Sequence, residues 1–69
     1  MDNKIKLYVF DEGHTFYKGE VWYCATVRAY NTTWGFLYRT FSRNSETPFK
    51  KAKAWAKKYV REHEGYETD

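Results

Sequence analysis

The chain has 69 residues, a mass of 8.4 kDa and a formal net charge of +3. Three Trp, seven Tyr and five Phe make 22% of it aromatic, and 30% is charged. A chain this short buries only about 60% of the surface that its unfolded form exposes, so it allows one domain with a thin core. This composition excludes a disordered tail, a membrane span and a multi-domain enzyme.

The cysteine and histidine content excludes a disulfide scaffold and a structural zinc site. Cys24 is the single cysteine, and the two histidines are far apart in the sequence. A structural zinc site needs four ligands in paired spacing. The first residues lack the apolar run of a signal peptide, and no stretch approaches 18 apolar residues. We therefore expect a cytoplasmic protein in a reducing setting, with no metal and no cofactor.

The first 42 residues have the composition of β-strands. Apolar and polar residues alternate from Ile5, and Asp11-Glu12-Gly13 has the chemistry of a turn that ends this strand. Thr15 to Tyr17 is a short extension before the turn at Lys18-Gly19. The β-branched and aromatic density then predicts two more strands, joined by a loop at Asn31-Thr32-Thr33. The predicted strands are residues 5–10, 20–30 and 34–42.

A helix is predicted after a polar connector at residues 42–46. Thr47 can accept the free amide hydrogens at its start, and Pro48 suits the first helical position. Strong helix formers follow, and Gly65 is a plausible stop. One apolar stripe is formed by Phe49, Ala52, Ala56, Val60 and His63, flanked by Trp55 and Tyr59.

These elements predict an α+β fold: a three-stranded antiparallel sheet packed on one face by a single C-terminal helix (β-β-β-α). The domain spans residues 1–64, and residues 65–69 form a frayed acidic tail. The helix covers one face of the sheet because neither element can bury its apolar side alone. The other face is left for water or a partner.

Alternation along the strands predicts which residues occupy that open face. Arg28 and Arg39 point away from the helix, because an unpaired buried guanidinium is very costly. A four-residue loop, 31–34, gives this register, whereas a three-residue loop would turn Trp34, Phe36 and Tyr38 outward; we favour the first. The open face then presents Lys6, Tyr8, Thr26, Arg28, Tyr30 and Arg39, with no carboxylate among them.

Cations interleaved with aromatic rings suit nucleic acid, since cations neutralise phosphate and rings stack on bases. The same surface suits a protein partner, because Tyr, Trp and Arg dominate interface hot spots. Lys50 and Lys51 lie in the first helical turn, where cations oppose the helix dipole. A solvated lysine face explains them, and so does a phosphate backbone at the helix N-terminus.

Residues 20–63 resemble the arm-type DNA-binding domain of phage integrases (tyrosine recombinases). The resemblance rests on the strand from Glu20-Val21-Trp22-Tyr23 to Tyr30, a turn, a third strand, and the helix that opens Pro48-Phe49-Lys50-Lys51-Ala52-Lys53-Ala54-Trp55. It implies a three-stranded sheet that enters the DNA major groove. It also implies packing roles for Tyr23 and Trp55, DNA contacts from Arg28 and Arg39, and a phosphate contact from Lys50 or Lys51.

Catalysis finds little support, because His14 and Cys24 have ordinary structural explanations and no glycine-rich phosphate loop is present. The sequence predicts a non-enzymatic module that binds duplex DNA, as a monomer or weak homodimer. The alternative is a protein-interaction module of phage or mobile-element type, an inhibitor or adaptor that binds a larger intracellular protein. The candidate nucleic-acid-binding residues are Lys6, Tyr8, Arg28, Tyr30, Arg39, Arg43, Lys50 and Lys51.

Overall fold

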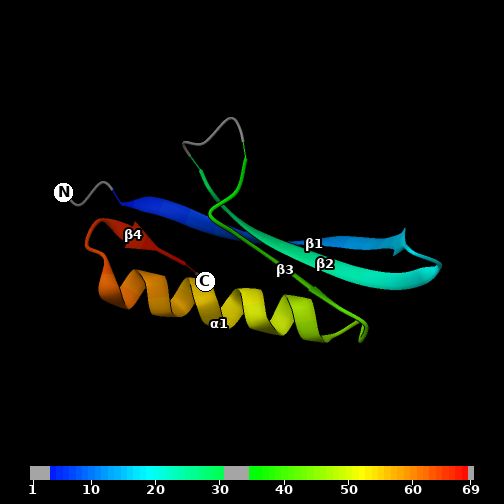
Figure 1. The fold of residues 1–69 in the computed structure, drawn as a ribbon. Coiled ribbons are helices and arrows are strands. Elements are labelled where there is room, and N and C mark those ends of the chain that lie inside the picture. The colour runs from blue at the N-terminus through cyan, green and yellow to red at the C-terminus, as the bar shows by residue number, and fades with distance from the viewer. Residues whose placement is uncertain (1–3, 31–34, 69) are drawn as a thin grey trace.

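The computed structural model describes residues 4–30 and 35–68. It consists of one helix packed on one face of a curled, mixed sheet (Figure 1). The sheet order is β3-β2-β1-β4, in which β4 runs parallel to β1 and the other neighbours are antiparallel. The elements are β1 (Ile5–Tyr17), β2 (Glu20–Ala29), β3 (Tyr38–Ser42), α1 (Thr47–Glu62) and β4 (Tyr66–Glu67).

The α+β class, the strand-strand-strand-helix order and the three antiparallel strands are confirmed, but the sheet has a fourth, parallel strand that was not predicted. Tyr66 and Glu67, placed by the sequence in a frayed tail, pair with Ile5 and Lys6 as a parallel fourth strand. Gly65 makes this possible: its φ of 90° turns the chain after the helix, and its carbonyl accepts a hydrogen bond from the Ile5 amide at 2.8 Å. Two residues carry too little pattern to predict a strand.

The first strand is also longer than expected, because the predicted turn at residues 11–13 is a β-bulge. Asp11 pairs with Ala25 and Gly13 with Cys24, so Glu12 is the extra residue. Gly13 has a φ of 80°, and its amide donates to Asp11 Oδ1 at 2.9 Å. The strand then continues to a two-residue turn at Lys18 and Gly19, whose φ values of 51° and 76° are the positive pair that a type I′ hairpin needs.

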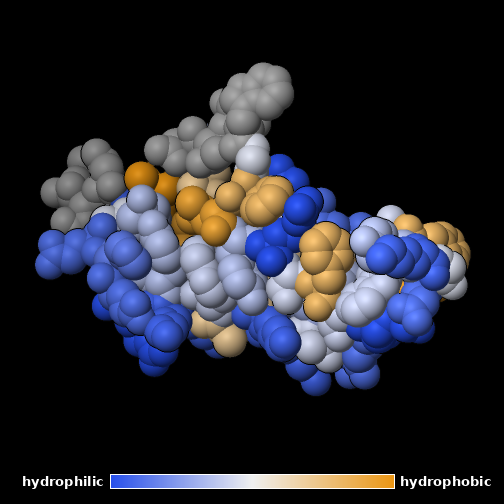
Figure 2. Space-filling view, viewed as in Figure 1, coloured by the Kyte–Doolittle hydropathy of each residue, from blue (hydrophilic) through white to orange (hydrophobic). Residues whose placement is uncertain are grey.

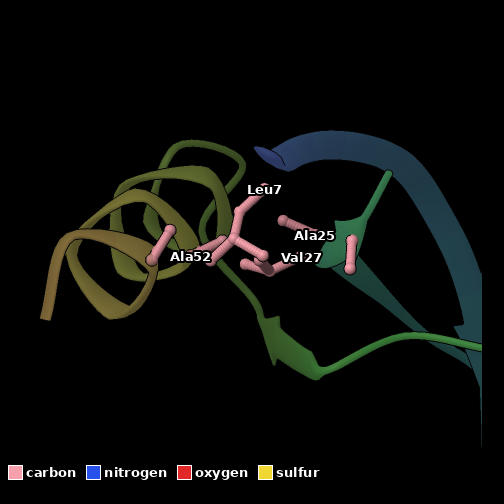
Figure 3. Packing of buried hydrophobic residues seen from close by; sticks show 6 residues of the cluster. Leu7, Ala25, Val27 and Ala52 are labelled. Carbon is pink, nitrogen blue, oxygen red and sulfur yellow. The ribbon is translucent and has the colours of Figure 1, made fainter. Parts of the chain in front are cut away.

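The hydrophobic core lies between α1 and the sheet face that carries every second residue of β1 and β2. Leu7 points from β1 toward the helix, where it meets Val27 and Ala52 (Figure 3). The helix approaches closely because its buried positions are small: Ala52 and Ala56 are fully buried. The buried hydrophobic residues are Leu7, Ala25, Val27, Ala29, Ala52 and Ala56. This is a thin core, as the length predicts.

A stacked column of rings extends the core along one side of α1. Trp55 stacks on Tyr38 of β3 with 4.9 Å between ring centroids, and on Tyr59 at 5.0 Å. His63 stacks on Tyr59 at 4.0 Å. A side-chain hydrogen bond with Tyr66 of β4 raises the pKa of Tyr59 above its ordinary value. The column therefore links both edge strands to the helix.

The helix begins one residue earlier than predicted, at the residue expected to be its cap. Thr47 is the first helical residue, and Glu46 is the N-cap residue, with no side-chain capping hydrogen bond among the described residues. Pro48 follows in the first turn as expected, and the helix ends at Glu62 with His63 as its C-cap. In the described part of the chain, no helix is both long and apolar enough to cross a membrane.

Candidate nucleic-acid interface

The face of the sheet opposite α1 gathers most of the predicted binding residues. Tyr8 pairs with Arg28 across β1 and β2, and Thr26 pairs with Arg39 across β2 and β3. Paired residues share a face, so these four lie on the side away from the helix. We call this surface the open face; its residues are Lys6, Tyr8, Phe10, Trp22, Thr26, Arg28, Tyr30, Arg39, Phe41 and Arg43.

The favoured hairpin register is confirmed by Tyr38, which lies on the helix side and stacks on Trp55. Arg39 and Phe41 consequently lie on the open face, opposite Thr26 and Cys24 of β2. The predicted loop at 31–33 and the predicted strand start at Trp34 lie outside the described residues. The third strand, as described, begins only at Tyr38.

Each of the four open-face cations lies over an aromatic ring. The Lys6 ammonium is 5.8 Å from the centre of the Tyr8 ring, and the Arg28 guanidinium is 5.8 Å from that of Phe10. Arg39 lies between two rings, 4.6 Å from Phe36 and 5.1 Å from Phe41. At the far end Arg43 lies 5.5 Å from the Trp22 ring. Such contacts hold the cationic groups against the sheet while leaving their charge near solvent.

The rings themselves are exposed and adjacent. Tyr8 lies 6.4 Å from both Phe10 and Tyr30, centre to centre. Phe10, Phe41 and Phe36 keep 44%, 45% and 42% of their surface exposed. In Figure 2, hydrophobic atoms reach the surface beside strongly hydrophilic ones in the region of β3. The face thus alternates apolar rings and positive charge.

Among the described residues, carboxylates lie on this surface where the sequence predicted none, and one of them is Glu67 of β4, which pairs with Lys6 in the sheet. The bulge brings Glu12 to 3.6 Å from Arg28, and Glu20 lies 3.0 Å from Arg43. Arg28 also donates to the Gly35 carbonyl at 3.3 Å. Within residues 4–30 and 35–68, Arg39 makes no ion pair. Arg39 is therefore the guanidinium whose donors are most available to a ligand.

The β-bulge at residues 11–13 could have been predicted from the sequence. Gly13 stands inside a pattern that resumes with His14 and Phe16, and an isolated glycine within a strand pattern is typical of a bulge. Phe10 and Phe41 were also missing from the predicted site, although the alternation that places Tyr8 and Arg39 outward places them there too.

The structure separates Lys50 and Lys51 from the other candidates. Both lie in the first turns of α1, which covers the opposite face of the sheet. Lys50 pairs with Glu46 at 3.7 Å on the exposed helix surface. These two lysines can reach only a ligand that extends beyond the open face to the helix N-terminus.

Thr26 and Cys24 line the centre of the open face without offering a catalytic group. Thr26 is only 2% exposed, and its hydroxyl has no hydrogen-bond partner among the described residues. Burial raises the pKa of the Cys24 thiol above its ordinary value, which disfavours the reactive thiolate. In the described ranges, no group of three His, Cys, Asp or Glu side chains is placed to hold a metal ion.

We compared the chain with protein-family models, with curated proteins and with solved structures, and none of them matches it.

Proposed function

We propose that this protein is a non-enzymatic nucleic-acid-binding module that binds duplex DNA through the open face. One observation carries the proposal: Lys6, Arg28, Arg39 and Arg43 line a single sheet face, each against an aromatic ring. Cations neutralise phosphates, and Arg donors hydrogen-bond guanine in the major groove. The resemblance of residues 20–63 to integrase arm-type domains is in keeping with this mode.

The dimensions of the sheet support a duplex ligand. Neighbouring strands lie about 4.8 Å apart, so β1, β2 and β3 together span about 10 Å, against a major-groove width of about 12 Å. Arg39 on β3 and Arg28 on β2 would meet base edges or the nearer phosphates. In this arrangement Lys50 and Lys51 contact only flanking phosphates, because α1 lies behind the sheet.

A protein partner is the second candidate, favoured by the exposed rings. Phe10, Phe36 and Phe41 are each more than two-fifths exposed, and Tyr30 is 76% exposed. Aromatic residues are enriched at protein interfaces, where they act as anchors. The two candidates differ in their response to salt, because phosphate binding releases counterions and an aromatic interface does not.

Binding of a fluorescent duplex, followed by anisotropy, tests the proposal. Four phosphate contacts predict that affinity falls about 10²-fold between about 50 and about 200 mM salt. The double change Arg28→Ala and Arg39→Ala should reduce the slope of log affinity against log salt by about 2. Absence of duplex binding at about 50 mM salt would overturn the proposal.

The matched control is the double change Lys57→Ala and Arg61→Ala, which removes the same charge from the exposed surface of α1. It should leave the slope within about half a unit of the unchanged protein. Equal losses for the two double variants would mean that net charge, and not the open face, drives binding. A single-stranded probe of the same length gives the comparison that separates duplex from single-strand recognition.

A further inference from the structure

The end of the β1–β2 hairpin extends past the helix. Thirteen residues of β1 span about 40 Å, whereas sixteen residues of α1 span about 24 Å. Figure 1 shows the hairpin end projecting beyond the N-terminal end of α1. We call this part, residues 13–22, the distal arm. A two-stranded ribbon on its own is marginally stable in water.

The distal arm exposes rings that nothing described covers. Phe16 is 69% exposed and Tyr17 is 61% exposed. Together with Thr15, Trp22 and Phe41 they line an apolar hollow of about 360 Å³. The charge on the arm is low, because Lys18 and Glu20 cancel. This composition is that of a protein contact and not of a phosphate-binding surface.

Among the described residues, the outer edge of β1 has no strand partner over the distal arm. β4 pairs only with Ile5 and Lys6, and the other described neighbour, β2, lies on the inner side. Residues 13–17 pair regularly with β2 after the bulge, so every second residue of this segment directs its backbone N–H and C=O groups to the outer edge. An exposed edge of this kind is a template for another strand.

The side chains along this edge are complementary to themselves about Thr15. An antiparallel pairing of two copies with Thr15 at the two-fold axis sets residue 12 opposite 18, 13 opposite 17 and 14 opposite 16. Glu12 of the bulge, which pairs with Arg28 at 3.6 Å within one chain, then comes close to Lys18 in the turn of the other copy and can form an ion pair with it. Lys18 has no ion pair of its own among the described residues. The symmetry makes this ion pair twice.

The remaining opposed positions fit equally well. Tyr17 faces Gly13, so its ring can lie over the glycine that leaves a gap on the sheet surface. His14 faces Phe16, and the two rings already form an edge-to-face contact at 5.9 Å within one chain. Cross-strand pairs of these kinds each add stability to a sheet.

We propose that the edge of the distal arm binds a second copy of this chain, by antiparallel β1–β1 pairing about Thr15. The two-fold axis is perpendicular to the sheet, so both open faces point to the same side of the dimer. The arm edge and the open-face cations are separate sets of residues. The dimer therefore does not require the open face to bind DNA, although Glu12 lies at both surfaces because it pairs with Arg28 within one chain.

Sedimentation equilibrium against protein concentration tests the dimer. We expect the mass to rise from 8.4 kDa toward twice that value. Lys18→Glu sets two pairs of like charges opposite each other and should weaken association about tenfold or more. The swap Glu12→Lys with Lys18→Glu restores both ion pairs and should restore association. Lys57→Glu, the same charge change on α1, should have no effect.

A site-specific spin label gives the register. With Cys24→Ser as background, a nitroxide at Thr15→Cys should show strong dipolar broadening between copies, whereas one at Lys57→Cys should show none. A single 8.4 kDa species up to about 1 mM would overturn the proposal. The proposal would also be overturned if Lys18→Glu left the association unchanged, because the dimer would then use another surface.

Discussion

Neutralising Glu12 should strengthen DNA binding, because this carboxylate lies on the open face beside Arg28. The two charged groups are 3.6 Å apart, and both side chains are more than a third exposed. At this separation the attraction is about 1 kcal/mol in water. Glu12→Gln removes it and leaves the Arg28 guanidinium for phosphate, which predicts a gain of about fivefold in affinity. The cost to folding stability should stay below about 1 kcal/mol, since exposed pairs contribute little.

The assay is duplex binding by anisotropy at low salt, with thermal unfolding measured in parallel. Glu62→Gln is the matched control: it removes the same charge from a comparable pair, 3.8 Å from Lys58, on α1. We expect it to change affinity less than about twofold, because α1 lies behind the sheet. An equal gain from both changes, or a loss from Glu12→Gln, would refute the assignment of binding to the open face.

Three further changes test the core and the centre of the sheet. Leu7→Ala should cost about 2–5 kcal/mol, a large part of the stability of a 69-residue chain, and should lower the melting temperature by about 10 °C or more. Thr26→Val should stabilise the fold by about 1 kcal/mol in urea unfolding, because it removes a buried hydroxyl without a partner. Alkylation of Cys24 should follow a pH midpoint higher in the folded than in the unfolded protein, since burial raises its pKa; an equal or lower midpoint would contradict its placement. The preference for the neutral thiol favours the folded state below the unfolded pKa and is lost as pH rises through the folded pKa.

The helix and the face of each long strand could be predicted because their patterns are strong and local. The segment after Pro48 is rich in lysine and alanine, which favour a helix independently of the surface against which it packs. Burying Arg28 or Arg39 without a partner would be very costly, so both must point away from the helix. Because side chains alternate along a strand, these two residues predict which face every other residue of β2 and β3 occupies. The stacking of Tyr38 on Trp55 confirms that register.

The errors arose where tertiary pairing decided the outcome. Asp11-Glu12-Gly13 has the composition of a turn, but the partner strand β2 continues alongside and makes it a bulge. The consequence for the site is large, since the bulge places Glu12 beside Arg28. Tyr66 and Glu67 form a strand only because the helix returns the chain to the edge of β1, which no local pattern encodes.

The position of Lys50 and Lys51 shows a further limit of sequence reasoning. Their charge and helical setting are evident from the sequence, but their distance from Arg28 and Arg39 depends on which face the helix covers. Whether a basic residue lies near the other site residues depends on how the elements are arranged in the fold, and the composition of the chain does not determine that arrangement.

The most direct test of the open face is an NMR titration of ¹⁵N-labelled protein with a short DNA duplex. We predict that the largest amide shifts fall in β1 from Lys6 to Phe10, in β2 from Thr26 to Ala29, and in β3 at Arg39 and Phe41. Amides of α1 beyond its first turn should shift little. Shifts centred on the exposed surface of α1, or no shifts at low salt, would contradict the account.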